Sequence, residues 1–135
     1  MSNSIVRKKS FELAVKVVKV CRALTIEKKE FTLSSQLLRS GTSIGSNVRE
    51  ALNTQTRREF IYKLSISQRE CDETLYWLEL LNSAQLLTPQ QFSSLQQDAT
   101  EIFKIIRSII LTAKTKAINE DKGKKVGERS PTLDS

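Results

Sequence analysis

The stretch SGTSIGSN, residues Ser40 to Asn47, decides how this chain folds. Six of its eight residues are Gly, Ser or Thr, which is a composition typical of a loop. Two interpretations compete: a loop that cradles a phosphate, or the interior of a helix. A phosphate loop of the G-x-x-x-x-G-K-S type has a lysine after its second glycine and a buried strand before its first. Gly45 is followed by Ser46, and a helical pattern precedes Gly41, so the helix is favoured.

The apolar pattern continues straight through this stretch. The inward positions at helical spacing are Leu33, Leu37, Ile44, Val48 and Ala51. Gly41 and Gly45 lie four residues apart on one face, where the missing side chains let a neighbouring helix approach closely. A glycine inside a helix costs about 1 kcal/mol relative to alanine, so a packing gain should offset it. Thr32 or Ser34 is the expected N-cap of this helix.

The preceding residues predict a first helix over residues 10–25, with Ser10 as its N-cap. Two neighbouring apolar stripes run along it, one with Phe11, Val15 and Val18 and the other with Leu13 and Val17. This apolar arc is wider than one neighbour would cover, which indicates either a central position or a contact between subunits.

The following residues predict two more helices. The third covers residues 57–84, behind a capping box of Thr56 and Glu59. The fourth begins at Thr88-Pro89, with Gln91 placed to close a second capping box. Its apolar residues repeat at steps of about three and four, as in a bundle seam: Phe92, Leu95, Ala99, Ile102, Ile106, Ile109 and Ala113.

Four such helices with short connections predict an all-α protein, an up-down-up-down four-helix bundle formed by residues 1–117. Residues 118–135 are polar and have no apolar period, so a disordered C-terminal tail is expected there. At 135 residues the chain is about the size of one domain.

The amino-acid composition limits the classes of function that this chain can have. The chain has no histidine, which excludes His-based triads and His-ligated metals and makes an enzyme or a cofactor unexpected. Its two cysteines, Cys21 and Cys71, occupy apolar-periodic positions that suit reduced, buried thiols. No apolar run is long enough for a membrane span, so a cytoplasmic location without membrane partners is expected. The net charge of +7 favours polyanionic partners, RNA or DNA first.

The positive charge is unevenly distributed. Residues 1–69 hold fourteen Lys/Arg against five Asp/Glu, whereas residues 70–101 hold six Asp/Glu and no Lys/Arg. An up-down-up-down topology brings nine cations to one end of the bundle as a candidate nucleic-acid-binding surface: Arg7, Lys8, Lys9, Arg49, Arg57, Arg58, Lys63, Lys114 and Lys116. Arg7 to Lys9 and Arg57-Arg58 stand near helix N-termini, where the dipole disfavours cations and an external phosphate would favour them. The alternative is an ordinary solvated surface.

Polar residues near the inner faces suggest a structural network between the second and third helices, the alternative being that all of them face water. Its expected members are Asn47, Glu50, Glu70, Glu73 and Thr74. The acidic run with Cys71, namely Glu70, Asp72 and Glu73, is the weakest alternative, a metal or enzyme site with an unusual ligand set.

Two segments, QLLRSGTSIGSNVREAL and RREFIYKLSISQRECDETLYWLELL, resemble the small bacterial four-helix-bundle proteins encoded in intervening sequences of large-subunit ribosomal RNA genes. The resemblance covers about residues 11–116. Its most specific part is Ser43 to Val48 with Glu50, although Arg49 and Leu52 replace the family's usual alanine and glycine. The resemblance implies a homopentamer with no catalytic residues and a poorly defined role, and a relative that serves as the accessory protein of diversity-generating retroelements.

The resulting hypothesis is a non-enzymatic, oligomeric bundle that binds nucleic acid through its basic end, directed to the backbone and weakly specific for sequence. The alternative is a protein-interaction adaptor, for example for a reverse transcriptase or another nucleic-acid enzyme. Its surface anchors would be Tyr62, Tyr76 and Trp77.

Overall fold

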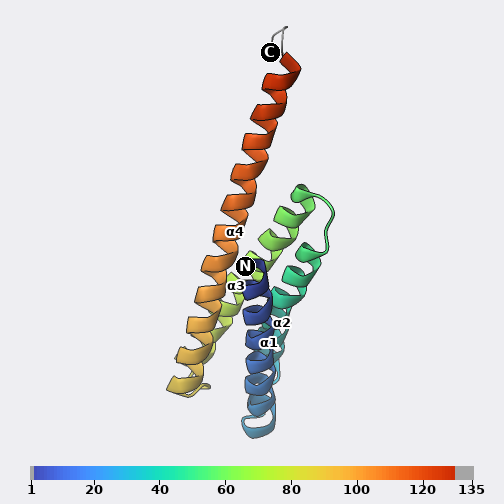
Figure 1. Ribbon diagram of the computed structural model, residues 1–135. Coiled ribbons are helices and arrows are strands. Elements are labelled where there is room, and N and C mark those ends of the chain that lie inside the picture. Colours follow the sequence, from blue (N-terminus) through green and yellow to red (C-terminus); the bar gives the residue numbers. More distant parts are fainter. Residues whose placement is uncertain (1, 130–135) are drawn as a thin grey trace.

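The computed structural model describes residues 2–129, and side chains are described for residues 3–123. This part of the chain forms four helices, α1 (Ser2–Glu27), α2 (Thr32–Leu52), α3 (Arg57–Ser83) and α4 (Pro89–Arg129). The N-terminus and the α2–α3 connection lie towards one end of the bundle, and the α1–α2 and α3–α4 connections lie at the other (Figure 1). The predicted all-α architecture is confirmed.

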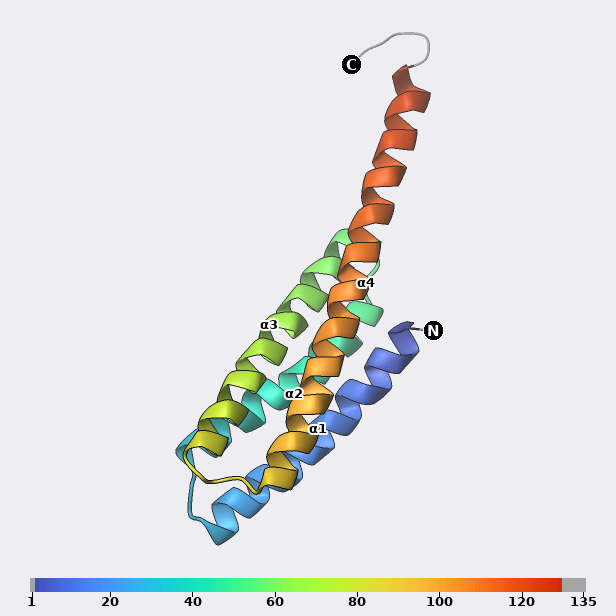
Figure 2. The same cartoon turned by 90° about the vertical axis from the view of Figure 1, so that its left-hand side faces the viewer.

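Each helix packs against two neighbours, in the order expected for an up-down-up-down bundle (Figure 2). α2 lies between α1 and α3, and α4 closes the bundle by packing against α3 and α1. The core consists of the inward stripes read from the sequence, with Leu37, Ile44 and Val48 of α2 fully buried. In α4 the seam from Leu95 to Ala113 is buried as well.

The stretch from Ser40 to Asn47 is helical throughout and lies inside α2. Its glycines face α1. A Cβ at Gly41 would lie 2.8 Å from Cγ2 of Val17, and a Cβ at Gly45 would lie 3.3 Å from the backbone oxygen of Ser10. The prediction that these glycines permit a close helix approach is therefore confirmed, and α1 is the helix that approaches.

The start of α1 differs from the prediction. The helix begins at Ser2 instead of Ser10, and Ser10 is a fully buried residue inside it. Its hydroxyl donates a hydrogen bond to the backbone oxygen of Arg7, 3.2 Å away, within the same helix. Ser10 therefore does not act as an N-cap. The earlier start also brings Val6 into the core with no exposed surface.

The predicted N-caps of α3 and α4 are confirmed, and that of α2 is corrected. Thr88 and Gln91 form the reciprocal box, with bonds of 2.9 and 3.0 Å, and the hydroxyl of Thr56 accepts from the Glu59 amide at 3.1 Å. At α2 neither Thr32 nor Ser34 is the N-cap. Instead a carboxylate oxygen of Glu30 accepts from the Ser34 amide at 2.9 Å.

The C-terminal part of α4 corrects the expectation of an irregular tail from residue 118. α4 continues as a helix to Arg129 and extends beyond the other three helices (Figure 1). An ion pair between Arg57 of α3 and Glu120 ties this extension to the bundle. Residues 130–135 lie outside the described residues, and the boundary between a bundle domain and a tail stays a prediction.

Candidate nucleic-acid interface

Several hollows lie where the predicted basic residues gather, and two of them adjoin each other. The first, the basic groove, is formed by α1 and the end of α2 and has a volume of about 620 Å³. The second, the end pocket, lies between the start of α1, the α2–α3 connection and α4, with a volume of about 520 Å³. Asn3 and Leu52 line both hollows, so the two adjoin.

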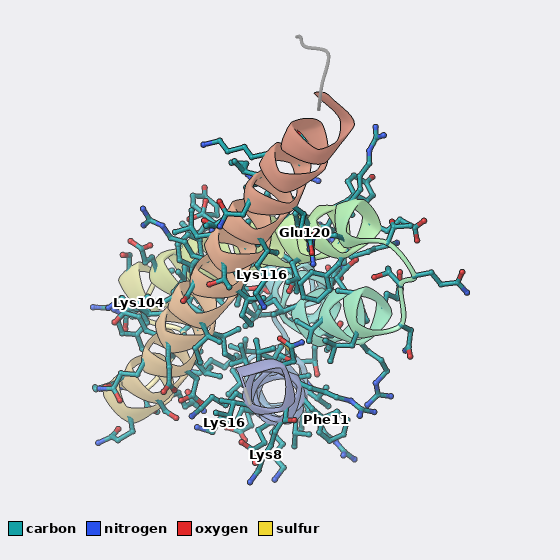
Figure 3. All side chains as sticks on the ribbon, turned by 45° about the horizontal axis from the view of Figure 1, so that its top comes forward. Lys8, Phe11, Lys16, Lys104, Lys116 and Glu120 are labelled. Carbon is teal, nitrogen blue, oxygen red and sulfur yellow. The ribbon has the colours of Figure 1, made fainter. Side chains whose placement is uncertain are left out.

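The basic groove carries Arg7 and Lys8 from α1 and Arg49 from α2. None of these three cations pairs with an acidic side chain of residues 3–123, although Glu12 lines the groove as well. Phe11 forms part of its wall and is 58 % exposed. Lys8 and Phe11 point outward from α1 in Figure 3. The groove therefore combines unpaired positive charge with an exposed aromatic ring.

The end pocket holds two further predicted cations, Arg57 and Lys116, contributed by α3 and α4. Phe60, Ile109 and Leu52 supply apolar lining. Lys116 and Glu120 lie on the side of α4 that faces α2 and α3 (Figure 3).

The remaining four predicted cations line neither hollow, and two of them are neutralised. Lys9 pairs with Glu101 of α4 at 3.1 Å, and Lys63 pairs with Glu50 of α2 at 2.7 Å. The hydrogen bond and charge of Glu50 raise the pKa of Lys63, which stays cationic. Arg58 and Lys114 are exposed outside both hollows.

The helix dipoles disfavour fewer of these cations than the sequence indicated. Because α1 begins at Ser2, residues 7–9 stand beyond its first turn, where the dipole has little effect. Arg57 and Arg58 do begin α3 directly after its Thr56 cap, so the unfavourable placement remains there. Glu120 offsets it at Arg57.

The predicted polar network is present only as separate pieces. Thr74 is fully buried, and its hydroxyl lies 3.0 Å from that of Ser40, joining α3 to α2. Glu70 and Glu73 both pair with Arg39 on the surface, and Glu73 also accepts from the indole of Trp77 at 3.0 Å.

The two other predicted members take no part in those contacts. The amide of Asn47 donates to the Ser43 oxygen of its own helix at 2.8 Å, and Glu50 pairs with Lys63. Sequence reasoning missed Ser40 and Arg39. The signal for Ser40 was its place four residues before Ile44 on the inner stripe of α2.

The cysteines are both buried and free. Burial raises the pKa of Cys21 to about 11. Burial, with a smaller contribution from the charge of Asp72, raises the pKa of Cys71 to about 12. Since the thiolate is the reactive form, both thiols are largely unreactive near neutral pH.

In the part of the chain that the structure describes, no cluster of three or more His, Cys, Asp or Glu is arranged to hold a metal ion. None of its helices has an apolar segment long enough to cross a membrane.

The family model described as 23S rRNA-intervening sequence protein matches residues 2–108, which include all of the basic groove. The chain belongs to this family. A crystal structure of a protein with unknown function from the S23 ribosomal protein family of Bacteroides thetaiotaomicron is similar to it, with a TM-score of 0.80 and 49 % sequence identity. The similarity covers 82 % of this chain and 98 % of that chain. A comparison with curated proteins found no match.

Proposed function

We propose that the protein is a non-enzymatic oligomer of four-helix bundles that binds RNA or DNA through the backbone at its basic end, with weak sequence preference. The observation that carries the proposal is the basic groove, where Arg7, Lys8 and Arg49 gather without acidic partners among residues 3–123. Unpaired cations on one surface neutralise phosphates and release counterions, which is the main source of backbone-directed affinity.

The proposed assembly is the homopentamer that the family resemblance implies, and an apolar stripe on α1 supports a contact between subunits. Phe11, Val15 and Val18 lie at spacings of four and three residues and are 58, 39 and 45 % exposed. α2 and α4 cover the other face of α1, so the chain itself leaves this stripe open. Part of the wide apolar arc predicted from the sequence therefore stays exposed to solvent within one chain, as expected when a second copy packs there. An oligomer would repeat the basic groove and increase avidity for a long strand.

The salt dependence of binding tests the nucleic-acid proposal. Fluorescence anisotropy with a labelled single-stranded oligonucleotide should show log affinity falling linearly with log salt. Replacing Arg7, Lys8 and Arg49 together by Gln should make that slope shallower by about 2, since each single-strand phosphate contact contributes about 0.7. The matched control replaces Arg22, Lys28 and Lys29 by Gln. These exposed residues lie towards the opposite end of the bundle, and their loss changes the net charge equally.

The control variant should bind with a slope near that of the wild type. An equal loss in both variants would mean that total charge, not the basic groove, attracts the strand. Binding that is insensitive to salt, or no binding at low salt, would contradict the proposal altogether.

A second candidate function, an adaptor for a reverse transcriptase or another nucleic-acid enzyme, is favoured by the outer face of α3. Tyr62 and Tyr76 are 60 and 57 % exposed and lie fourteen residues apart on this face, and tyrosine is enriched at protein interfaces. Trp77 is half-buried and engaged with Glu73, which makes it the poorest anchor of the three. A pull-down from nuclease-treated lysate distinguishes the candidates: an adaptor retains a partner that the Tyr62→Ser/Tyr76→Ser variant loses.

A further inference from the structure

The end pocket adjoins the basic groove through Asn3 and Leu52 and adds residues of the α2–α3 connection, α3 and α4. Its volume of about 520 Å³ lies within the range of roughly 300–1,000 Å³ that is usual for small-molecule sites. Its apolar lining comes from three elements: Leu52 at the end of α2, Phe60 in α3 and Ile109 in α4. Ile109 is almost fully buried, and the other two are half-buried, so the surface they present is held in place by the core.

The pocket carries positive charge from two helices. Arg57 stands at the first position of α3, and Lys116 stands on α4 beyond the match to the family model. Lys116 has no acidic partner among residues 3–123. Arg57 pairs with Glu120, but both members are solvent-exposed in part, with 35 and 65 % of their side-chain surfaces accessible. An exposed pair of this kind is weak and exchanges readily for a stronger anion such as a phosphate.

Four of the six uncharged polar side chains that line the pocket are available to a ligand. Asn3, Gln55, Ser108 and Thr112 line it, and none of their side chains hydrogen-bonds to another residue among 3–123. Two amides and two hydroxyls can donate and accept in turn, as the edge of a nucleobase and a ribose require. Thr54 and Thr56 are different, because their hydroxyls are already used by the Ala51 oxygen and the Glu59 amide.

We infer that the end pocket binds a phosphate-bearing nucleotide, with its base against Phe60, Leu52 and Ile109 and its phosphate between Arg57 and Lys116. A purely apolar ligand would leave both cations and four hydrogen-bonding side chains unused, and inorganic phosphate would leave the apolar lining unused. The ligand is either a free mononucleotide or the terminal nucleotide of a strand. In the second case the inference rests on the proposed function, since it names the part of the nucleic acid that enters the pocket.

Glu120 acts as a competitor in this arrangement. Its carboxylate occupies Arg57 in the ligand-free protein, and the ligand's phosphate takes its place. Glu120→Gln therefore removes a competing anion and should tighten nucleotide binding by a few-fold. Arg57→Gln and Lys116→Gln remove the phosphate partners and should weaken it about tenfold or more, the scale of one charge-assisted hydrogen bond.

Isothermal titration of the full chain with adenosine monophosphate, adenosine and inorganic phosphate tests the site. We expect the monophosphate to bind at least tenfold more tightly than either fragment. Arg58→Gln and Lys114→Gln are the matched controls, because each removes an exposed cation that neighbours a pocket residue without lining the pocket. Both should change affinity less than twofold. Circular dichroism confirms that each variant keeps its helices.

Two oligonucleotides that differ only in a 5′-phosphate or a 5′-hydroxyl identify the source of the ligand. If the 5′-phosphate raises the affinity for the oligonucleotide and Arg57→Gln abolishes that increase, the pocket binds strand ends. If the monophosphate binds but the 5′-phosphate does not raise the affinity, the pocket binds free nucleotides. Equal losses in Arg57→Gln and Arg58→Gln, or a monophosphate no tighter than inorganic phosphate, would overturn the inference. If oligonucleotides then still bind with a strong salt dependence, the proposed function stands without this pocket. If neither they nor the monophosphate bind, both fail.

Discussion

Gly41 is the residue on which the packing of α1 against α2 depends most directly. A Cβ there would lie 2.8 and 2.9 Å from the two γ-carbons of Val17, closer than real Cβ contacts. Val17 is fully buried and β-branched, so its side chain has no easy way to move aside. The missing side chain thus sets the distance between the two helices.

Gly41→Ala should lower the free energy of unfolding. Alanine gains about 1 kcal/mol in helix propensity, but overpacking costs about 1–3 kcal/mol, so a net loss of about 1 kcal/mol is expected. Urea denaturation measures it. Gly123→Ala is the control, because nothing lies within 4 Å of a Cβ at Gly123.

A double-mutant cycle strengthens this test. Val17→Ala removes both γ-carbons that the new methyl group meets, so the Gly41→Ala substitution should cost less in that background. A Gly41→Ala protein as stable as the wild type would show that α1 does not approach α2 this closely.

The starts of the helices differ in how visible they are in the sequence. Thr88 with Gln91 and Thr56 with Glu59 are local signals, since the capping atoms lie within four residues of each other. The box at Thr88 is confirmed in full, whereas at Thr56 only the hydroxyl cap forms and the Glu59 carboxylate makes no return bond among the described residues. The start of α1 was missed because Ser10 has the chemistry of a cap. Only the packing of Val6 into the core reveals the extra turns before it.

The α4 extension was missed for a related reason. Its residues bury too little apolar surface to produce an apolar period in the sequence, but Ala, Lys and Glu continue a helix that has already been nucleated.

For the candidate site, topology alone predicted that the cations gather at one end. The pairing of Lys9 with Glu101 and of Arg57 with Glu120 depends on the register between helices, which no sequence pattern fixes.

Thr88→Ala tests the start of α4. The change removes the oxygen that accepts from the Gln91 amide and should lower the free energy of unfolding by about 1 kcal/mol. Thr115→Ala, inside the same helix, removes a hydroxyl that bonds only to the Leu111 oxygen and should stay within about 0.5 kcal/mol of the wild type. Thermal or urea melts of the two variants separate these outcomes. Equal stabilities would mean that the box does not hold the helix start.

At the scale of the whole molecule, one face of α1 is covered by the bundle and the other is exposed. One face is used inside the bundle, with Leu13 and Val17 fully buried. The opposite face carries the exposed stripe of Phe11, Val15 and Val18, which runs on from the basic groove at Phe11. Assembly through this stripe would therefore bring the basic grooves of neighbouring copies close together, and oligomeric state and nucleic-acid affinity should be coupled.

Sedimentation velocity tests this coupling. The wild type should sediment as an oligomer, with the mass of five chains for the proposed pentamer. Val15→Gln/Val18→Gln should shift it towards monomer, because each change places a polar amide in the apolar contact, and neither residue lines the basic groove. Leu111→Gln is the control, since Leu111 is 56 % exposed on α4, away from the stripe. A monomeric wild type, or an oligomer that the double variant leaves intact, would exclude this stripe as the subunit contact.

If the double variant is monomeric, its affinity for a long oligonucleotide should fall by at least tenfold. Its affinity for a short oligonucleotide should change little, because only the long strand spans several grooves.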